Sequence, residues 1–237
     1  IHEGMQIVSN EKRLIKNIVN KKNDLQDFNI ISFKDVSVTY REKFIIKDIS
    51  FSIYKNKINI IKGPSGIGKS TCLNILTGLV KPSGGEIFFD DKLSNLFQND
   101  FWQEKLGYLT QSNYLFNTSI MENITFLKDY DQIDKDKFHF AIKLSNIEKV
   151  FDINKIKTFT VGINGSKVSG GQAQKILFAR SIYFGKDILI LDEPTSGLDN
   201  VSKEDMISSL KALTQDYSYT IVLSTHESFE NLDCNTI

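Results

Sequence analysis

Hydrophobic and polar positions alternate between residues 30 and 61 of this 237-residue chain, which is typical of half-buried antiparallel strands. Strands of this kind are predicted at residues 31–33, 36–39 and 49–53, and a buried strand is predicted at residues 59–61, before a glycine cluster. From about residue 98 to residue 161 the chain is predicted to be mostly helical, with apolar groups such as Phe138, Ala141, Ile142 and Leu144.

Strands and helices also alternate in the remaining parts of the chain. Predicted helices cover residues 71–79, 173–183 and 201–213, and predicted strands cover residues 87–89, 188–191 and 220–223. The run at residues 188–191 is continuously apolar, which indicates a central strand that is covered on both faces. This alternation predicts an α/β fold with a largely parallel sheet and a β-rich edge.

The N-terminal residues 5–22 place apolar side chains near helical spacing and basic side chains elsewhere. They are either a basic surface helix docked by its apolar stripe or the end of a longer helix that enters from a preceding domain. Residues 23–29 are then a linker. Because the chain begins at Ile1 and stops at Ile237, where a new apolar segment begins, we expect a fragment whose C-terminus is truncated.

Composition narrows the possible classes of protein. The 29 basic and 29 acidic residues balance, which argues against a strong field for nucleic acid or an anionic membrane. Two cysteines, Cys72 and Cys234, cannot build a disulfide framework and suit a reducing compartment. The longest apolar runs are far shorter than the roughly 18 residues that a membrane span needs. These features predict a soluble cytosolic chain.

The strongest chemical signal is a phosphate-binding loop from Gly63 to Ser70. It fits the pattern G-x-x-x-x-G-K-[ST] and lies between a predicted strand and a predicted helix, which is the context that its chemistry requires. Its glycines allow backbone N–H groups and the helix N-terminus to face an anion. Lys69 is expected to reach the β- and γ-phosphates of a nucleotide, and the Ser70 hydroxyl is expected to bind Mg²⁺.

Two carboxylates, Asp192 and Glu193, follow the predicted central strand. The carboxyl ends of parallel strands are where α/β sheets bind ligands. We therefore expect Asp192 to hold Mg²⁺ through water and Glu193 to orient or deprotonate an attacking water. His226 follows the predicted strand at residues 220–223 in the same way, and we expect it to contact the γ-phosphate.

Residues Val168–Gln172 open a predicted helix with a serine and two glycines. By its physical properties this segment is a second helix N-terminus suited to an anion, although it is equally a simple capped helix start. One phosphate-binding loop already serves one nucleotide. A second phosphate-facing element therefore suggests that a γ-phosphate is clamped from another subunit.

Together these motifs resemble the nucleotide-binding domain of ATP-binding cassette (ABC) proteins, from about Ile30 to the C-terminus and in the family's order. Gly63–Thr71 resembles the Walker A loop, Val168–Gln172 the signature LSGGQ, and Ile188–Pro194 the Walker B strand with its catalytic glutamate. Gln111 resembles the Q-loop glutamine, which follows a strand, and Ser196–Asp199 resembles the D-loop. His226 resembles the switch histidine, and Tyr40 lies where the family stacks an aromatic ring on adenine.

The resemblance implies a P-loop NTPase core with a mainly parallel sheet, an antiparallel β edge subdomain and an α-helical subdomain at about residues 98–185. The ABC domain would cover residues 29–237, and residues 1–28 would be a linker helix from a preceding transmembrane domain. Two such domains would face head to tail and bury two ATP molecules. The implied cofactors are ATP and Mg²⁺.

The site residues that the resemblance implies fall into three groups. The catalytic group is Lys69, Gln111, Glu193 and His226. The nucleotide-binding group is Tyr40, Gly63, Ser65, Gly66, Gly68, Lys69, Ser70 and Thr71, together with Ser169, Gly170, Gly171, Gln172 and Asp199 of the signature and D-loop. The Mg²⁺ group is Ser70, Gln111 and Asp192.

Three stretches resemble exporters within this family. Residues 116–124 resemble the segment after the exporter Q-loop, residues 160–165 resemble the exporter X-loop, and Ser9–Leu14 resembles the helix that links a fused membrane domain to the ATPase. Ile163 departs from the X-loop pattern, which has a glutamate there. The implied protein is the ATPase part of an exporter on the cytoplasmic side of a cell membrane. Its implied partners are a transmembrane domain and a second nucleotide-binding domain, with no nucleic acid.

Two alternatives remain. The ATPase subunit of an ABC importer shares the same motifs, although it would lack the leading helix. A chromosome-maintenance or DNA-repair ATPase is less compatible, because residues 111–168 are too few for a long helical hairpin at 1.5 Å per residue and the charge is balanced. The sequence indicates neither the transported substrate nor whether the pair is a homodimer or a heterodimer.

Overall fold

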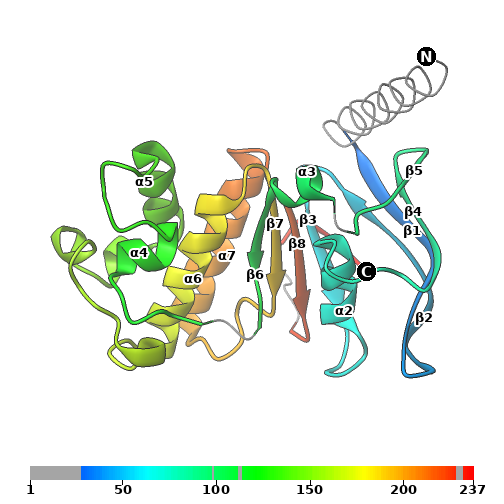
Figure 1. Ribbon diagram of the computed structural model, residues 1–237, viewed down its shortest axis with the longest axis horizontal. Coiled ribbons are helices and arrows are strands. Elements are labelled where there is room, and N and C mark those ends of the chain that lie inside the picture. Colours follow the sequence, from blue (N-terminus) through cyan, green and yellow to red (C-terminus); the bar gives the residue numbers. More distant parts are fainter. Residues whose placement is uncertain (1–27, 98, 112–113, 228–231) are drawn as a thin grey trace, which may run out of the picture.

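Two β-sheets organise the chain, and helices cover the larger sheet on both faces (Figure 1). The computed structural model describes residues 28–97, 99–111, 114–227 and 232–237. The predicted linker helix at residues 1–28 lies outside this part of the chain, apart from Phe28. Phe28 is buried, and its ring packs edge-on against Phe89 and Trp102 at centroid distances of 5.4 and 6.0 Å.

The smaller sheet is antiparallel, with strand order β2-β1-β4-β5. Its strands are β1 (Ile30–Tyr40), β2 (Lys43–Tyr54), β4 (Gly84–Phe89) and β5 (Lys92–Ser94). The prediction of separate strands at residues 31–33 and 36–39 was wrong, because both belong to β1. The pairing with β2 is irregular between Phe33 and Val36, and Asp35 has a φ of 50° there. This bulge shifts the alternation by one residue, and the sequence pattern therefore looks like two short strands.

The larger sheet is parallel throughout, with strand order β6-β7-β8-β3-β9. Its strands are β3 (Ile58–Lys62), β6 (Leu106–Leu109), β7 (Ile188–Asp192), β8 (Thr220–Thr225) and β9 (Cys234–Thr236). Every residue of β7 and β8 is buried, which confirms the prediction of a central strand covered on both faces. The mainly parallel core with an antiparallel sheet beside it is also confirmed.

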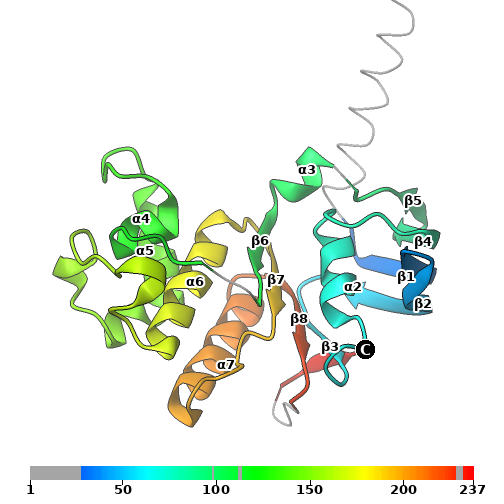
Figure 2. The same ribbon diagram turned by 60° about the horizontal axis from the view of Figure 1, so that its bottom comes forward.

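Successive side chains of the central strands enter two different hydrophobic cores. Ile188 and Ile190 pack with helix α2 (Lys69–Leu76) and the antiparallel sheet. Leu189 and Leu191 pack on the opposite face with helices α6 (Gly170–Phe184) and α7 (Asn200–Gln215). Figure 2 shows the same layers from another side, with α2 on one face of the parallel sheet and α6 and α7 on the other.

The region from residue 98 to residue 161 is less helical than its apolar spacing predicts. Helices α3 (Asp100–Gln103), α4 (Ile120–Thr125) and α5 (Lys135–Leu144) are short. Single turns of 3₁₀-helix lie at Ile147–Lys149 and Ile153–Lys155, and another lies just beyond this region at Ile163–Gly165. Strand β6 lies between α3 and α4 and pairs with β7, so the predicted helical subdomain at 98–185 includes one strand of the core sheet. Strand β6 has only four residues, and one of them is glycine. This pattern is too short to indicate a strand.

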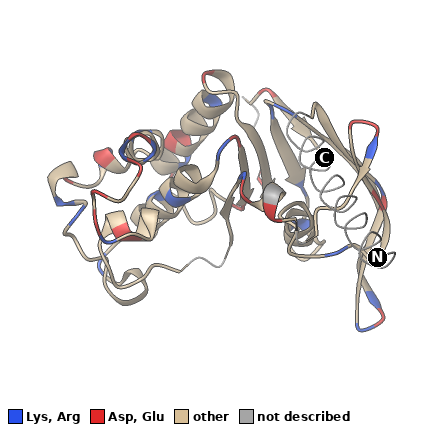
Figure 3. Ribbon diagram, turned by 45° about the horizontal axis from the view of Figure 1, so that its top comes forward, with Lys and Arg blue, Asp and Glu red and all other residues tan. Residues whose placement is uncertain are grey.

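Figure 3 shows acidic and basic residues interspersed along the helices and loops, whereas the strands of the parallel sheet carry few of them. This distribution agrees with the equal numbers of acidic and basic residues. Among the described residues, no helix is both long enough and apolar enough to cross a membrane.

Candidate functional site

The loop between β3 and α2 has the backbone of a phosphate-binding loop. Gly66 and Gly68 have φ values of 82° and 106°, in the region that favours glycine. A Cβ atom on Gly68 would lie 2.3 Å from Ile46 Cγ2, so a side chain there would also clash with β2. The loop ends where α2 begins at Lys69, and its residues Ser65 and Gly66 are exposed. The first N–H groups of a helix have no partner within the helix, so those of α2 are available to an anion bound in the loop.

Lys69 is buried, with an exposed fraction of 6%, and its ammonium group is held inside the loop. Lys69 Nζ donates to the backbone oxygens of Gly63 at 2.9 Å and Pro64 at 3.1 Å. It also lies 3.5 Å from Glu193 Oε1. The cation of the loop is thus fixed next to the carboxylate that follows β7.

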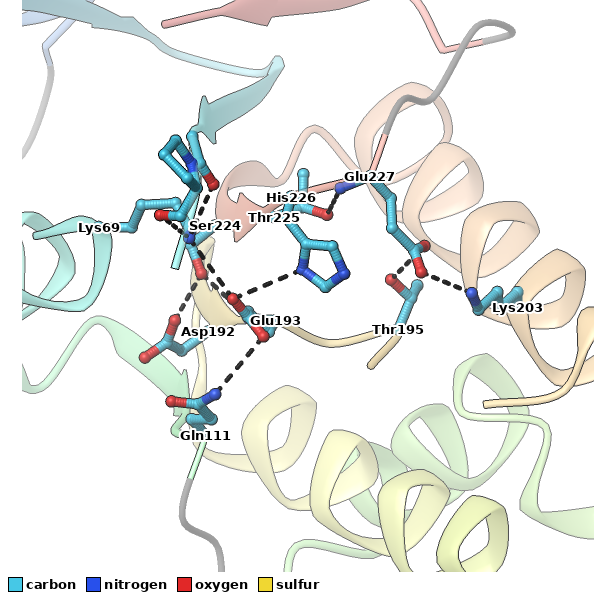
Figure 4. Close-up of polar contacts among 12 residues, drawn as sticks. Lys69, Gln111, Asp192, Glu193, Thr195, Lys203, Ser224, Thr225, His226 and Glu227 are labelled. Atoms are coloured by element: carbon cyan, nitrogen blue, oxygen red, sulfur yellow. Dashed lines mark hydrogen bonds and ion pairs between the residues drawn. The ribbon is translucent and has the colours of Figure 1, made fainter. Parts of the chain in front are cut away.

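Asp192 and Glu193 are positioned by β7 and by its neighbour β8 (Figure 4). Ser224 Oγ on β8 donates to Asp192 Oδ1, and the backbone N–H of Glu193 donates to Ser224 Oγ at 3.0 Å. Glu193 has a φ of 48°, so the chain turns sharply as it leaves the strand. This turn directs the Glu193 side chain toward Lys69 rather than along the sheet.

Gln111 and His226 complete the group around Glu193. Gln111 follows β6, and its Nε2 donates to Glu193 Oε2 at 3.5 Å. His226 follows β8, and its Nδ1 lies 3.7 Å from Glu193 Oε1. The ends of β6, β7 and β8 and the start of α2 therefore bring together all four residues of the predicted catalytic group.

The signature segment lies at the N-terminus of α6. Ser169 caps the helix: its Oγ accepts from the backbone N–H of Gln172 at 3.2 Å, and Gln172 Oε1 accepts from the backbone N–H of Ser169 at 2.9 Å. Ser169 and Gly170 are exposed. Among the described residues, no hydrogen bond or ion pair joins residues 169–172 to Lys69 or Glu193. The structure therefore keeps the two predicted phosphate-facing elements of one chain apart.

Two further predicted nucleotide-binding residues are exposed. Asp199 caps α7, where its Oδ1 accepts from the backbone N–H of Ser202 at 2.9 Å and its Oδ2 from Ser202 Oγ at 3.1 Å. These bonds, the backbone one foremost, lower the pKa of Asp199 below its ordinary value. Tyr40 ends β1 with an exposed fraction of 61%, and the guanidinium of Arg41 lies over its ring, 5.2 Å from the centroid.

Two polar residues next to the site, Ser224 and Tyr108, are not among the residues predicted from the sequence. Ser224 is fully buried and binds Asp192, and Tyr108 on β6 donates to Asn74 Oδ1 at 2.9 Å. Burial, with a smaller effect from Asp192, raises the pKa of Tyr108 to about 12, so its hydroxyl stays neutral beside the site. A serine near the end of an otherwise apolar buried strand was the available signal for Ser224.

Comparison with known proteins gives consistent results. The protein-family model described as ABC transporter matches residues 46–196. The ergothioneine transport ATP-binding protein EgtV of Helicobacter pylori is 32% identical over 203 residues, covering 85% of this chain and 92% of that protein. The ATP-dependent lipid A-core flippase of Ralstonia nicotianae is 33% identical over 191 residues, covering 79% of this chain but 32% of the flippase.

A solved structure of a bacterial Atm1-family ABC exporter with ATP bound superimposes with a TM-score of 0.75 and 26% sequence identity. The match covers 89% of this chain and 37% of the exporter chain. This chain therefore spans about a third of the length of these two exporter-type proteins and nearly the whole length of EgtV.

Proposed function

This chain belongs to the ABC transporter family as an ATP-binding domain, and from that membership we propose that it hydrolyses ATP to drive export across a membrane. The observation that carries the proposal is the position of Lys69. Its ammonium group is fixed inside a glycine loop and next to the Glu193 carboxylate, at 3.5 Å. A phosphate chain in the loop would therefore place its terminal group beside a cation and a potential base at once.

Lys69, Glu193 and His226 have separate roles in this proposal. The loop from Gly63 to Thr71 binds the phosphates through backbone N–H groups, and Lys69 offsets their charge. Glu193 orients the attacking water and accepts its proton. His226, which lies near Glu193 as Lys69 does, donates to the γ-phosphate. The protein thus contributes positioning and charge stabilisation rather than covalent chemistry.

The oxygen donors at the site suit Mg²⁺. Ser70 offers a hydroxyl, Gln111 an amide oxygen and Asp192 a carboxylate, which are the hard oxygen ligands that this cation prefers. No group of three or more His, Cys, Asp or Glu side chains suited to a metal occurs among the described residues. The three side chains would therefore hold Mg²⁺ together with phosphate oxygens, and the ion would neutralise phosphate charge.

A second copy of the domain completes the site in this proposal. Ser169 and Asp199 cap exposed helix N-termini, and in the described part of the chain no hydrogen bond or ion pair joins either residue to the Lys69 loop. Facing copies arranged head to tail would bring Ser169 to the γ-phosphate held by the partner copy. ATP would then hold the two copies together, and hydrolysis would release them.

Export is the direction of transport that the similarities to the lipid A-core flippase and to the Atm1-family exporter support. We infer a transmembrane domain as the second partner and a position on the cytoplasmic side of the membrane. Thr160 pairs with Ser119 in an isolated bridge, and the neighbouring Ile163 has an exposed fraction of 72%. The proposed X-loop is thus tied to the segment after Gln111 and presents an apolar side chain where exporters have glutamate.

A separate ATP-binding subunit, as in importers, is the second candidate. The near full-length match to EgtV favours it, since that protein is itself a transport ATP-binding protein. The size of the native polypeptide separates the two functions. If the chain is part of an exporter half-transporter, the native polypeptide is several times larger than 27.0 kDa, and only detergent extracts it from membranes. A separate subunit predicts a small polypeptide that alkaline carbonate releases from them.

The activity itself is tested by phosphate release from the purified chain. We expect release with Mg-ATP and none when the divalent cation is chelated. Release that is equally fast without a divalent cation would contradict the assigned Mg²⁺ role. An absence of both ATP binding and hydrolysis would contradict the proposed function.

A further inference from the structure

A carboxylate directly after His226 is held on both of its oxygens (Figure 4). Lys203 Nζ donates to Glu227 Oε1 at 2.6 Å, and Thr195 Oγ1 donates to Glu227 Oε2 at 3.3 Å. The backbone N–H of Glu227 donates to Thr225 Oγ1 at 2.9 Å. Glu227 is therefore fixed by side chain and backbone together, although it lies outside the predicted catalytic group.

The three partners of Glu227 come from three different parts of the site. Thr225 is the last residue of β8, and Thr195 lies two residues after Glu193; both are buried, with exposed fractions of 2%. Lys203 lies in the first turn of α7, where its backbone N–H donates to the backbone oxygen of Asp199 at 2.9 Å. Glu227 thus connects the segment after the strand of Glu193, the end of β8 and the helix that Asp199 caps.

His226 itself has little that holds its ring. Its side chain has an exposed fraction of 55%, and the polar contact that it makes within the described part of the chain is the one with Glu193 at 3.7 Å. The position of the ring is consequently set by the backbone on either side of it, at Thr225 and Glu227. On the N-terminal side of His226 the backbone is held by the buried sheet, to which Thr225 belongs. On the C-terminal side it is held by the side-chain contacts of Glu227.

We propose that Glu227 is a positioning residue for His226. The ion pair between Glu227 and Lys203 would transmit a movement of the Asp199 turn, the turn at which α7 begins, to the backbone of His226. This inference rests on the proposed ATPase function, in which the Asp199 turn faces the partner copy. Closure of the two copies would move the start of α7, and Lys203 would carry Glu227 and the backbone of His226 with it. Hydrolysis would then depend on the pair, whereas binding of ATP to the Lys69 loop would not.

Charge reversal gives the most direct test. Glu227→Lys and Lys203→Glu should each lower kcat by about tenfold or more, since small displacements of a catalytic group have large effects on rate. The dissociation constant for ATP should stay within about twofold of the parent value, because the change is confined to turnover. The double variant restores the opposite charges in exchanged positions and should recover most of kcat. Lys149→Gln is the matched control, since it removes another ion pair of α7, with Asp205, at a distance from His226.

A second arm tests whether Glu227 acts through His226. In a His226→Ala background, Glu227→Lys should cause no further loss of the residual rate, since the positioned ring is already absent. If thermal unfolding shows that Glu227→Lys does not fold, Glu227→Gln takes its place, both as a single variant and in the His226→Ala background. Unchanged kcat in the single variants, or an equal further loss without His226, would overturn the inference. A parent chain that neither binds nor hydrolyses ATP would instead overturn the proposed function.

Discussion

Lys69 Nζ lies 3.5 Å from Glu193 Oε1, and both side chains are largely buried, with exposed fractions of 6% and 13%. The lysine comes from the start of α2 and the glutamate from the end of β7, and they are 124 positions apart in the sequence (193 − 69). A phosphate bound by Lys69 would enter the same small volume as the Glu193 carboxylate. In the proposed function Lys69 binds ATP and Glu193 acts in its hydrolysis, and the two functions should therefore be separable by mutation.

Glu193→Gln should abolish turnover while ATP binding is retained. The amide keeps the size of the side chain but cannot accept a proton from water, so we expect kcat to fall by at least about 100-fold. ATP-bound dimers of this variant should persist longer, which size-exclusion chromatography with ATP would detect. Glu204→Gln, an exposed carboxylate on α7, is the control. Hydrolysis by Glu193→Gln at the parent rate would exclude Glu193 as the base.

Lys69→Ala should lose most of the affinity for ATP. It removes the cation of the loop along with the bonds to the Gly63 and Pro64 carbonyls, and we expect the dissociation constant to rise by about 100-fold, as for loss of a charge-assisted contact of about 3 kcal/mol. A fluorescent-nucleotide titration would measure it. Lys81→Ala, at an exposed position beyond α2, should leave affinity unchanged. Equal affinity in the two variants would count against the phosphate-loop role.

Substitutions of Ser169 separate helix capping from nucleotide contact. Ser169→Ala removes the cap of α6 and should lower stability by about 1 kcal/mol. Ser169→Asp retains a good cap, but it places a negative charge where the partner's γ-phosphate would lie. We therefore expect normal unfolding and strongly reduced turnover for Ser169→Asp, measured by urea titration and phosphate release. If only Ser169→Ala impairs turnover, the segment serves as a cap alone.

Asp205 should stabilise the fold in a pH-dependent manner. Lys149 Nζ and Lys175 Nζ each lie 2.8 Å from one of its oxygens, and these hydrogen bonds lower the pKa of Asp205 below its ordinary value of 3.8. Lys175 has an exposed side-chain fraction of only 7%, so Asp205→Asn leaves a buried ammonium without its charge partner. We expect Asp205→Asn to cost about 2–4 kcal/mol at pH 7. Lys149→Gln, which removes the exposed lysine, should cost less than about 1 kcal/mol.

The lowered pKa of Asp205 determines how its contribution to stability changes with pH. The stabilisation is complete above the ordinary value of 3.8 and is lost as pH falls through the lower pKa of the folded state. The gap between the parent chain and Asp205→Asn in urea midpoint should therefore stay constant from pH 7 to about pH 5 and shrink below pH 3.8. A gap that widens in acid would contradict the assigned ion pairs.

Much of the site could be predicted from sequence because its residues follow strand ends. Asp192 and His226 come directly after or just past apolar runs, and Lys69 follows a glycine loop with a fixed spacing. The parallel sheet brings such strand ends to one edge, and the structure confirms their convergence. The assigned roles of these residues in binding and hydrolysis remain predictions that the variants above test.

Other features depend on contacts that a local pattern does not contain. The bulge in β1 is fixed by pairing with β2, where Ser50 Oγ accepts from the backbone N–H of Asp35 at 2.8 Å. Strand β6 exists because it pairs with β7 and packs closely on α6, where a Cβ on Gly107 would lie 1.9 Å from the Ser181 backbone oxygen. The bonds of Glu227 join residues 24 and 32 positions apart. Periodicity within one segment cannot indicate such partners.

In the proposed function two copies of this chain form the complete ATPase site, and the dependence of the phosphate-release rate on protein concentration shows whether they do. Phosphate release per mole of chain should be measured with saturating Mg-ATP over a wide range of protein concentration, with Glu193→Gln as the blank. We expect the specific rate to rise with protein concentration and then to level off as copies pair. A substantial and constant specific rate at concentrations where light scattering shows the chain to be monomeric would mean that one copy suffices, and it would exclude the two-copy site.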